Sequence, residues 1–324
     1  MPRKSQPAPL DGALIIDKPQ GRTSHDVVDA ARRILGFRQI GHLGTLDPLA
    51  TGVLVLLLGR ATRLAQFYTG RRKRYTSTFR FGFATDTYDA DGTAQGPDSA
   101  PALDRAEIER LSAARIGLFP QMPPPYSAKK IHGRPAHELA RKKKPVELKA
   151  VDIEVYDFRV DEVVGPLARV SIECAAGAYI RSLAHDMGAA LGCGAHLAAI
   201  VRTAVGEFTL DQATKLEDLE RAAAEGRLAQ YVIPLERLLP ELPSATVPPP
   251  VEQRVRHGSK FTVQLAQIQP GRHTVAQGST AELNSGEWKP ARLRVFNQQD
   301  RMIAIAEAVV PRTYQPVVVL EAEA

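Results

Sequence analysis

The sequence predicts a large domain of mixed helices and strands, of the α/β (α+β) class, followed by a small all-β domain. Up to about residue 238, alternating segments typical of strands are interleaved with segments whose apolar residues recur at helical spacing. A proline-rich stretch, "PELPSATVPPP" (240–250), then precedes short alternating segments separated by Gly, Asn and Pro. We therefore expect a flexible tail (1–10), the large domain (11–238), a linker (239–250) and the β domain (251–324).

Local patterns place the elements of the large domain. "ALIID" reads as a strand, and Ser24 as the N-cap of a helix that Gly36 ends. The run "VLVLLL" predicts a buried strand, and the acidic "TDTYDADG" predicts a turn. In chain order, we expect a helix at 24–35, a strand at 52–58, a helix at 61–70, a strand at 75–83, a helix at 104–115, strands at 150–160 and 167–175, and a helix from Tyr179.

The charge distribution points toward a phosphate-rich partner. The chain has 324 residues and a formal charge of +6, and residues 1–74 carry 13 lysines and arginines against five aspartates. Two basic runs, "RRKR" (71–74) and "RKKK" (141–144), could neutralise nucleic-acid phosphates, although a run of this kind is more often a solvated surface. The proline- and lysine-rich segment at 121–150 is typical of a binding insertion.

Several classes of protein are disfavoured. The first ten residues resemble neither a signal peptide nor a membrane anchor, and Cys174 and Cys193 suggest neither a disulfide framework nor a zinc site. We therefore expect a cytoplasmic protein. The histidines show no metal-binding spacing, and phosphate-binding glycine motifs are absent, so we expect no metal and no organic cofactor.

One loop deserves a chemical explanation. "GHLGTLDPLATG" (41–52) sets three glycines around a single carboxylate, Asp47. Leu-Asp-Pro alone would usually be a turn or a helix cap. The glycines, however, permit backbone shapes closed to other residues and let a ligand approach closely. If Asp47 is catalytic, it acts without a second carboxylate in a comparable loop.

The segment "GHLGTLDPLATGVLVLLLGRATR" resembles the signature of TruB-type tRNA pseudouridine synthases. Four further blocks resemble the same family in the same order, and the resemblance covers about residues 11–238. These blocks are "DKPQGRTSHDVV" (17–28), "KRYTSTFRFGFATDTYDADG" (73–92), "PPPYSAKKIHGRPAHELAR" (123–141) and "CAAGAYIRSLAHDMGAALGCGAHLAAIVRTAVGEF" (174–208).

The resemblance implies a pseudouridine synthase fold with a central, largely antiparallel mixed sheet, and a PUA-like C-terminal β domain. It also implies isomerisation of uridine 55 in the T arm of tRNA. Asp47 matches the catalytic aspartate, either as a nucleophile or as a base at C2′ that yields a glycal intermediate. Arg181 matches its ion-pair partner, and a guanidinium could keep a buried carboxylate ionised. Tyr75 matches the tyrosine that stacks on the base.

Other matched positions imply contacts around the target nucleotide. Tyr179 and Ile200 would belong to the substrate pocket. His42 matches a histidine that inserts among RNA bases when the target is turned out of the stack. The basic positions that match are Lys18, Lys130, Arg141 and Arg202, which we expect to bind RNA, although Lys18 could instead support the active-site loop.

Two alternatives remain open at this stage. A non-catalytic tRNA-binding or tRNA-folding protein would also need the basic half of the chain. A dyskerin-like synthase would work in a guide-RNA particle, whereas the insertion at 121–150 favours an enzyme that acts alone. We therefore expect tRNA as the partner, with no membrane, no obligate protein partner and a monomeric state.

Overall fold

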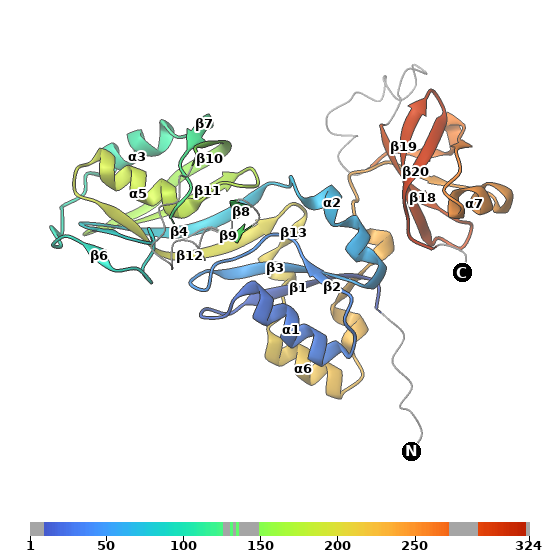
Figure 1. The fold of residues 1–324 in the computed structure, drawn as a ribbon, viewed down its shortest axis with the longest axis horizontal. Coiled ribbons are helices and arrows are strands. Elements are labelled where there is room, and N and C mark those ends of the chain that lie inside the picture. Colours follow the sequence, from blue (N-terminus) through green and yellow to red (C-terminus); the bar gives the residue numbers. More distant parts are fainter. Residues whose placement is uncertain (1–9, 126–129, 132–133, 136–148, 272–290, 322–324) are drawn as a thin grey trace.

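The computed structural model describes residues 10–125, 130–131, 134–135, 149–271 and 291–321. Figure 1 shows an elongated molecule with the larger α/β part on one side and the C-terminal β domain on the other. The predicted mixed domain with a smaller β domain is therefore confirmed.

A ten-stranded sheet forms the larger part, with the order β14-β1-β3-β12-β4-β11-β10-β7, while β13 and β2 pair at its sides. All its pairs are antiparallel except β3 with β12, so the expected largely antiparallel mixed sheet is confirmed. Its strands are β1 (Gly12–Lys18), β2 (Ile40–His42), β3 (Thr51–Leu58), β4 (Lys73–Phe81), β7 (Gly117–Gln121), β10 (Val151–Val164), β11 (Leu167–Cys174), β12 (Ala195–Val205), β13 (Phe208–Thr209) and β14 (Val232–Pro234).

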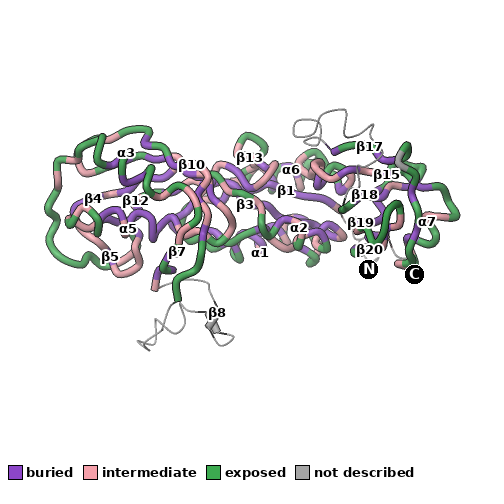
Figure 2. The backbone as a smooth tube through the Cα atoms, turned by 90° about the horizontal axis from the view of Figure 1, so that it is seen from above, coloured by how far each residue is buried: buried purple, intermediate pink, exposed green. Residues whose placement is uncertain are grey.

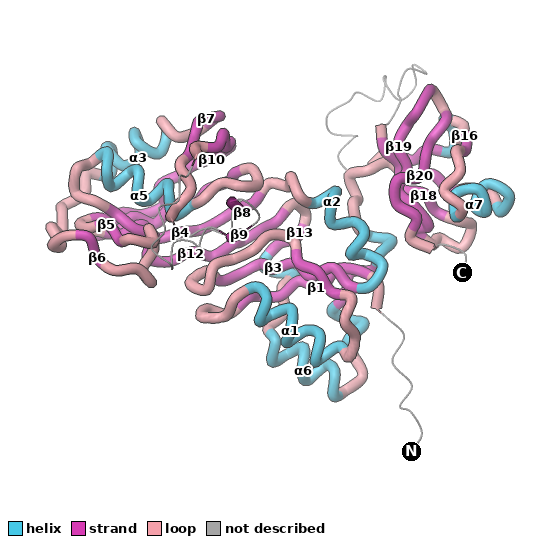
Figure 3. The backbone as a smooth tube through the Cα atoms, in the orientation of Figure 1, coloured by secondary structure: helices cyan, strands magenta, loops and turns pink. Residues whose placement is uncertain are grey.

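Helices cover one face of this sheet. Strand β3 is apolar at every position from 53 to 58 because alternate side chains enter two different cores. Its residues Leu54, Leu56 and Leu58 share one core with the helices, which Figure 3 shows as α1 and α6 below the strands and α3 and α5 at the opposite end. These helices are α1 (Ser24–Leu35), α3 (Arg105–Ala113), α5 (Ile180–Ala190) and α6 (Leu216–Ala224).

The N-terminus of α1 corrects one prediction. Thr23, and not Ser24, is the N-cap: its side chain accepts a hydrogen bond from the Asp26 amide, and Asp26 binds back to Thr23. The hydroxyl of Ser24 is turned inward instead, toward the loop that carries Asp47. The predicted helical stop at Gly36 is confirmed, with φ of 73°.

The other core joins the two parts of the molecule. It contains Val53, Val55 and Leu57 of β3, the segment of η1 (Gly59–Leu64) and α2 (Ala65–Tyr68), and Met302 and Ile305 of the C-terminal domain. Figure 2 shows buried backbone along the central strands and again inside the small domain.

The small domain has its own six-stranded sheet, in the order β16-β20-β19-β18-β15-β17. Its first strand and its helix lie partly within 239–250, so that stretch is not simply the linker that we predicted. The elements are β15 (Ser244–Thr246), α7 (Pro249–Arg256), β16 (Phe261–Thr262), β17 (Ile268–Gln269), β18 (Arg292–Phe296), β19 (Met302–Val310) and β20 (Thr313–Val319).

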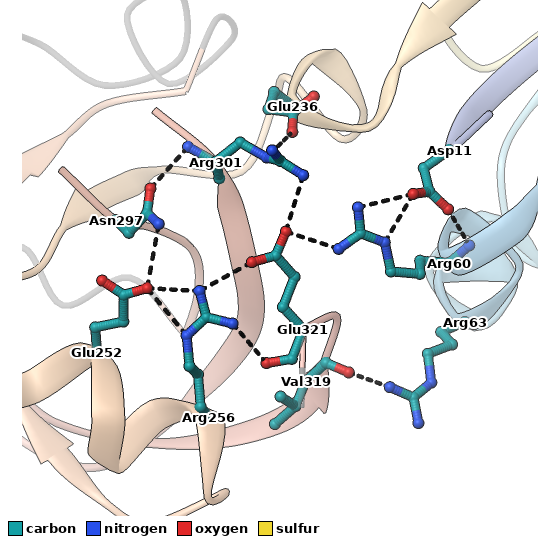
Figure 4. A network of polar contacts seen from close by, with 10 residues as sticks. All are labelled: Asp11, Arg60, Arg63, Glu236, Glu252, Arg256, Asn297, Arg301, Val319 and Glu321. Carbon is teal, nitrogen blue, oxygen red and sulfur yellow. Dashed lines mark hydrogen bonds and ion pairs between the residues drawn. The ribbon is translucent and has the colours of Figure 1, made fainter. Parts of the chain in front are cut away.

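Ion pairs reinforce the junction between the two parts (Figure 4). Glu321 accepts hydrogen bonds from Arg60 of the α/β part at 2.7 Å, from Arg256 at 2.9 Å and from Arg301 at 3.0 Å. Arg60 also binds Asp11, which immediately precedes β1. The end of the C-terminal domain is therefore tied directly to the start of the central sheet.

Candidate active site

The candidate site lies where β3 begins beside β12. These two strands pair only through Thr51 with Val201 and Gly52 with Arg202. The residues of β12 that precede Val201 therefore pair with β4 on one side but not with β3 on the other. A pocket of about 320 Å³ opens here, at the small end of the range for ligand sites. Its lining includes Asp47, Tyr75, Tyr179, Arg181 and Ile200.

Three buried side chains fix the backbone of the Asp47 loop. Ser24 both donates to the Leu46 carbonyl and accepts from the Leu46 amide. The ammonium of Lys18 donates to the carbonyls of Pro19, Arg22 and Pro48. On the other side of the aspartate, the guanidinium of Arg202 binds the carbonyls of Gly44, Thr45 and Val53. The backbone of the loop is thus fixed on both sides of Asp47.

Two of the three glycines in the loop are required by its shape. Gly44 and Gly52 have φ of 84° and 93°, in the left-handed region that side chains disfavour. A Cβ on Gly52 would lie 2.3 Å from the Arg202 carbonyl oxygen. Gly41 lies in β2 without positive φ and with open space around it, so the expected backbone role is wrong for Gly41.

Arg181 joins two acidic residues from different loops. Its Nε lies 3.0 Å from Asp47 Oδ2, while its Nη1 lies 3.3 Å from Asp89 Oδ2 and donates to the Thr87 carbonyl at 3.0 Å. Arg181 and Asp89 are almost completely buried, each with a side chain 7% exposed. The predicted proximity of Asp47 and Arg181 is therefore present in the structure.

Sequence reasoning missed Asp89, because "TDTYDADG" was interpreted only as a turn. The loop leaves β5 (Ala84–Thr85), returns through β6 (Ala94–Gln95), and binds the free edge of β12. There Leu197 donates to the Tyr88 carbonyl and accepts from the Ala90 amide. The dense acidic composition was the available signal, but only the tertiary fold shows which carboxylate turns inward.

The environment of Asp47 makes protonation easier than in water. Burial raises the pKa of Asp47, and the neighbouring charge of Asp89 raises it too, while Arg181 and Lys18 act to lower it. The side chain of Asp47 remains 48% exposed because it lines the open pocket. Its other side faces buried Arg181. An aspartate that is accessible from the pocket and paired with an arginine on its other side is suited to contact a ligand.

The pocket walls carry the predicted aromatic and apolar residues. Tyr75 projects from β4 directly opposite Arg202 of β12, and burial raises the pKa of Tyr75 to about 12. Its hydroxyl therefore remains protonated at neutral pH. Ile200 is 8% exposed and forms apolar wall. Tyr179 precedes α5, and both its backbone polar groups bind the side chain of Gln121, a contact that the sequence did not predict.

The residues predicted to bind RNA have different fates. Lys18 and Arg202 are 0% exposed and bind backbone carbonyls, so the structure contradicts their assignment as RNA contacts and supports the loop-supporting alternative for Lys18. His42 is half-buried at the end of β2, where burial lowers its pKa. Lys130 lies in the short strand β8 (Lys130–Ile131), and its side chain, like all of Arg141, falls outside the described residues.

The described residues contain no cluster of three or more histidine, cysteine or acidic side chains arranged to hold a metal ion. Among those same residues, every helix is too short or too polar to cross a membrane. The pocket thus brings together an accessible carboxylate, a buried guanidinium that pairs with it, and a neutral phenol, and its lining also includes Lys73, Tyr179 and Arg202.

Comparisons with known proteins agree with this arrangement. Residues 32–180 match the model of the TruB family pseudouridylate synthase (N terminal domain), and residues 181–240 match the tRNA pseudouridylate synthase B C-terminal domain. A tRNA pseudouridine synthase B from Solibacter usitatus is 43% identical over 96% of this chain and 100% of its own length. Another from Syntrophotalea carbinolica is 37% identical over 89% of this chain and 98% of its own.

Solved structures extend the likeness to the fold of nearly the whole chain. An H/ACA RNP bound to a substrate RNA containing 2′-deoxyuridine contains a chain that matches with a TM-score of 0.70 and 22% identity. That match covers 96% of this chain and 85% of the other. An archaeal box H/ACA sRNP Nop10-Cbf5 complex matches with a TM-score of 0.67, 23% identity, and coverage of 96% and 86%.

Proposed function

Because this chain belongs to the TruB family of pseudouridylate synthases, we propose that its pocket isomerises uridine 55 in the T arm of tRNA, with Asp47 as the catalytic carboxylate. The chain is a tRNA pseudouridine synthase, an isomerase. The observation that carries the assignment of the residues is the position of Asp47, which is half-exposed above and bound by buried Arg181 below.

The reaction needs only the groups that the pocket contains. The N1–C1′ bond of uridine breaks, the uracil turns over, and C5 bonds to C1′; C5 then loses its proton and N1 gains one, so no oxidant and no water is consumed. Asp47 acts either as the nucleophile or as the base at C2′, and both roles require its ionised form. Arg181 favours that form against desolvation.

Tyr75 and Ile200 provide surfaces for the planar base. A uracil that has been turned out of the RNA stack needs an aromatic or apolar contact to offset the lost stacking. Tyr75 of β4 lies across β12 from Gly52, where the loop that carries Asp47 ends, and Ile200 continues the wall along β12. We assign the stacking contact to Tyr75, which in that position would lie near the C5 proton. We assign the apolar wall to Ile200 and the adjoining wall to Tyr179.

The RNA outside the pocket would meet basic and insertion residues. His42 remains our proposal for the side chain that enters the RNA stack, and the 121–150 segment with Lys130 and Arg141 for contacts to the T arm. Phosphate contacts of this kind make affinity fall with salt.

The Asp47→Asn variant tests the catalytic assignment. Asparagine preserves shape and polarity, so binding of an unmodified T-arm RNA should persist while release of tritium from C5-labelled uridine stops. A variant that binds RNA and still releases tritium would refute the role of Asp47. The non-catalytic alternative predicts no release even from the wild-type protein.

We also propose that the enzyme acts as a monomer without a guide RNA or protein partner. Purified protein mixed with a T-arm stem-loop should convert the single uridine at position 55, as mapped by pseudouridine-specific chemical modification. A strict requirement for added RNA or protein would favour the guide-dependent alternative instead.

A further inference from the structure

We infer that Tyr88 and His185 form a positioning pair that sets Arg181 and Asp89 relative to Asp47. The inference rests on the proposed function, since its consequence is the rate of that reaction. The rings of Tyr88 and His185 are stacked, with centroids 3.7 Å apart and planes 11° from parallel. Neither residue lines the pocket, so they would act through their neighbours.

Each member of the pair lies close in the chain to residues of the ion pair. On α5, His185 follows Arg181 by four residues and therefore shares its face of the helix. In the loop, Tyr88 stands between Thr87 and Asp89, which both bind the Arg181 guanidinium. The stack and the ion pair between Arg181 and Asp89 thus join the same helix to the same loop. On α5, the stack lies one helical turn after the ion pair.

The backbone at Tyr88 shows that this arrangement is specific. Tyr88 has φ of 66°, in the left-handed region, which costs a residue other than glycine about 1 kcal/mol or more. Its amide and its carbonyl bind Thr85 and Leu197, so the turned conformation is held at both sides. With Tyr88 in this conformation, Thr87 and Asp89 both reach Arg181 while the tyrosine ring lies on His185.

The stacked contact with Tyr88 restrains the His185 ring. The Nδ1 atom of His185 is buried and has no hydrogen-bond partner among the described residues. Packing against a flat aromatic face therefore orients the imidazole, and such aromatic pairs contribute about 0.5–1.5 kcal/mol beyond simple burial. Loss of either ring would remove one of the contacts that hold the loop against α5 near Arg181.

Small shifts of this kind have large kinetic effects, because a displacement of about 1 Å can cost about a hundredfold in rate. We expect Tyr88→Ala and His185→Ala each to lower kcat by about tenfold. KM for the T-arm RNA should stay unchanged, since neither residue lines the pocket. The double variant should be no slower than the single ones, because both remove one contact.

Conservative variants separate the ring from the backbone. Tyr88→Phe and His185→Phe keep two stacked rings and should retain wild-type kcat. Tyr88→Gly relieves the unfavourable φ but removes the ring, and it should be as slow as Tyr88→Ala. A fast glycine variant would overturn the inference, because it would show that only the backbone conformation matters; a raised KM with normal kcat would instead indicate direct contact with RNA.

A remote aromatic pair provides the matched control. Phe261 and Tyr314 contact each other in the C-terminal domain, with centroids 6.1 Å apart. Tyr314→Ala should lower the melting temperature without lowering kcat. If the wild type releases no tritium, the proposed function fails; if the wild type reacts and the alanine variants at 88 and 185 match its kcat, only the positioning inference fails.

Discussion

Arg181 binds the carboxylates of Asp47 and Asp89 at the same time, through Nε at 3.0 Å and Nη1 at 3.3 Å. Both acids line the pocket, but they are not equivalent, because the side chain of Asp47 is 48% exposed whereas that of Asp89 is 7% exposed. One guanidinium therefore both pairs with the carboxylate that we propose to react and is itself held in place by the other acid.

Replacing Asp89 by Asn should shift the acid side of the pH–rate profile. The charge of Asp89 raises the pKa of Asp47, so its removal lowers that pKa and leaves Asp47 ionised in more acidic solution. The acid limb of kcat/KM should therefore move to lower pH, while kcat falls about tenfold as Arg181 loses an anchor. Asp91→Asn, in the same loop, should leave the limb in place; a shift to higher pH in Asp89→Asn would contradict the electrostatic argument.

Lys18→Met tests whether this lysine supports the loop or binds RNA. Methionine leaves the carbonyls of Pro19, Arg22 and Pro48 without their buried donor, so stability should fall by about 2 kcal/mol or more, as measured by urea denaturation. The slope of log Kd against log salt should not change. Loss of a phosphate contact would lower that slope by about 1, the result we expect at exposed Arg74 if it touches RNA.

Gly52→Ala should destabilise the protein much more than Gly41→Ala. At Gly52, a methyl group would approach the Arg202 carbonyl oxygen to 2.3 Å on a backbone with φ of 93°, whereas Gly41 has open space. We expect a loss of more than about 1 kcal/mol for Gly52→Ala. Equal melting temperatures for the two variants would show that the loop relaxes around an alanine.

Glu321→Gln should weaken the junction between the two domains. Burial alone would raise the pKa of Glu321, but hydrogen bonds from Arg60 and Arg256 outweigh burial and lower it. The stabilisation is therefore present at neutral pH and is lost as pH falls through the folded-state pKa. In urea denaturation, the variant should have a free energy of unfolding about 1–3 kcal/mol lower than the wild type at pH 7. The difference between the two proteins should become smaller in acid.

A surface pair serves as the control for that measurement. Glu307 binds Arg292 at 2.8 Å, but its side chain is 41% exposed. Glu307→Gln should change stability by less than about 1 kcal/mol. Equal losses in the two variants would mean that the Glu321 network contributes no more than an isolated surface ion pair.

The sequence predicted local features best where one short segment determines them. The run from Val53 to Leu58 correctly predicted a buried strand, which the structure shows to be buried on both faces, and Gly36 correctly marked the end of α1. The cap at Thr23 was missed because Ser24, an equally good capping residue, follows it, and only the distant loop at Leu46 explains why Ser24 turns inward.

Long-range contacts explain what the sequence could not predict about the site. Nothing local distinguishes a lysine that binds phosphate from Lys18, whose partners include a carbonyl 30 residues away. In the sequence, Asp89 is not distinguished from the other acids of its loop, because its burial depends on the contact of that loop with β12. The proximity of Asp47 and Arg181 was accessible only through the family resemblance, because 134 positions separate them in the chain.

The ladder between β3 and β12 contains only two residue pairs, although both strands continue well beyond it. The half of the sheet that contains β1 and the half that contains β4 are therefore joined in the ladder by very few backbone bonds, at the edge of the pocket. Separation of the halves by a small rotation would leave the longer ladders within each half intact. Any such rotation would also have to break the hydrogen bonds from Arg202 to Gly44, Thr45 and Val53 and divide the core that both halves share, so side chains rather than backbone bonds hold this seam.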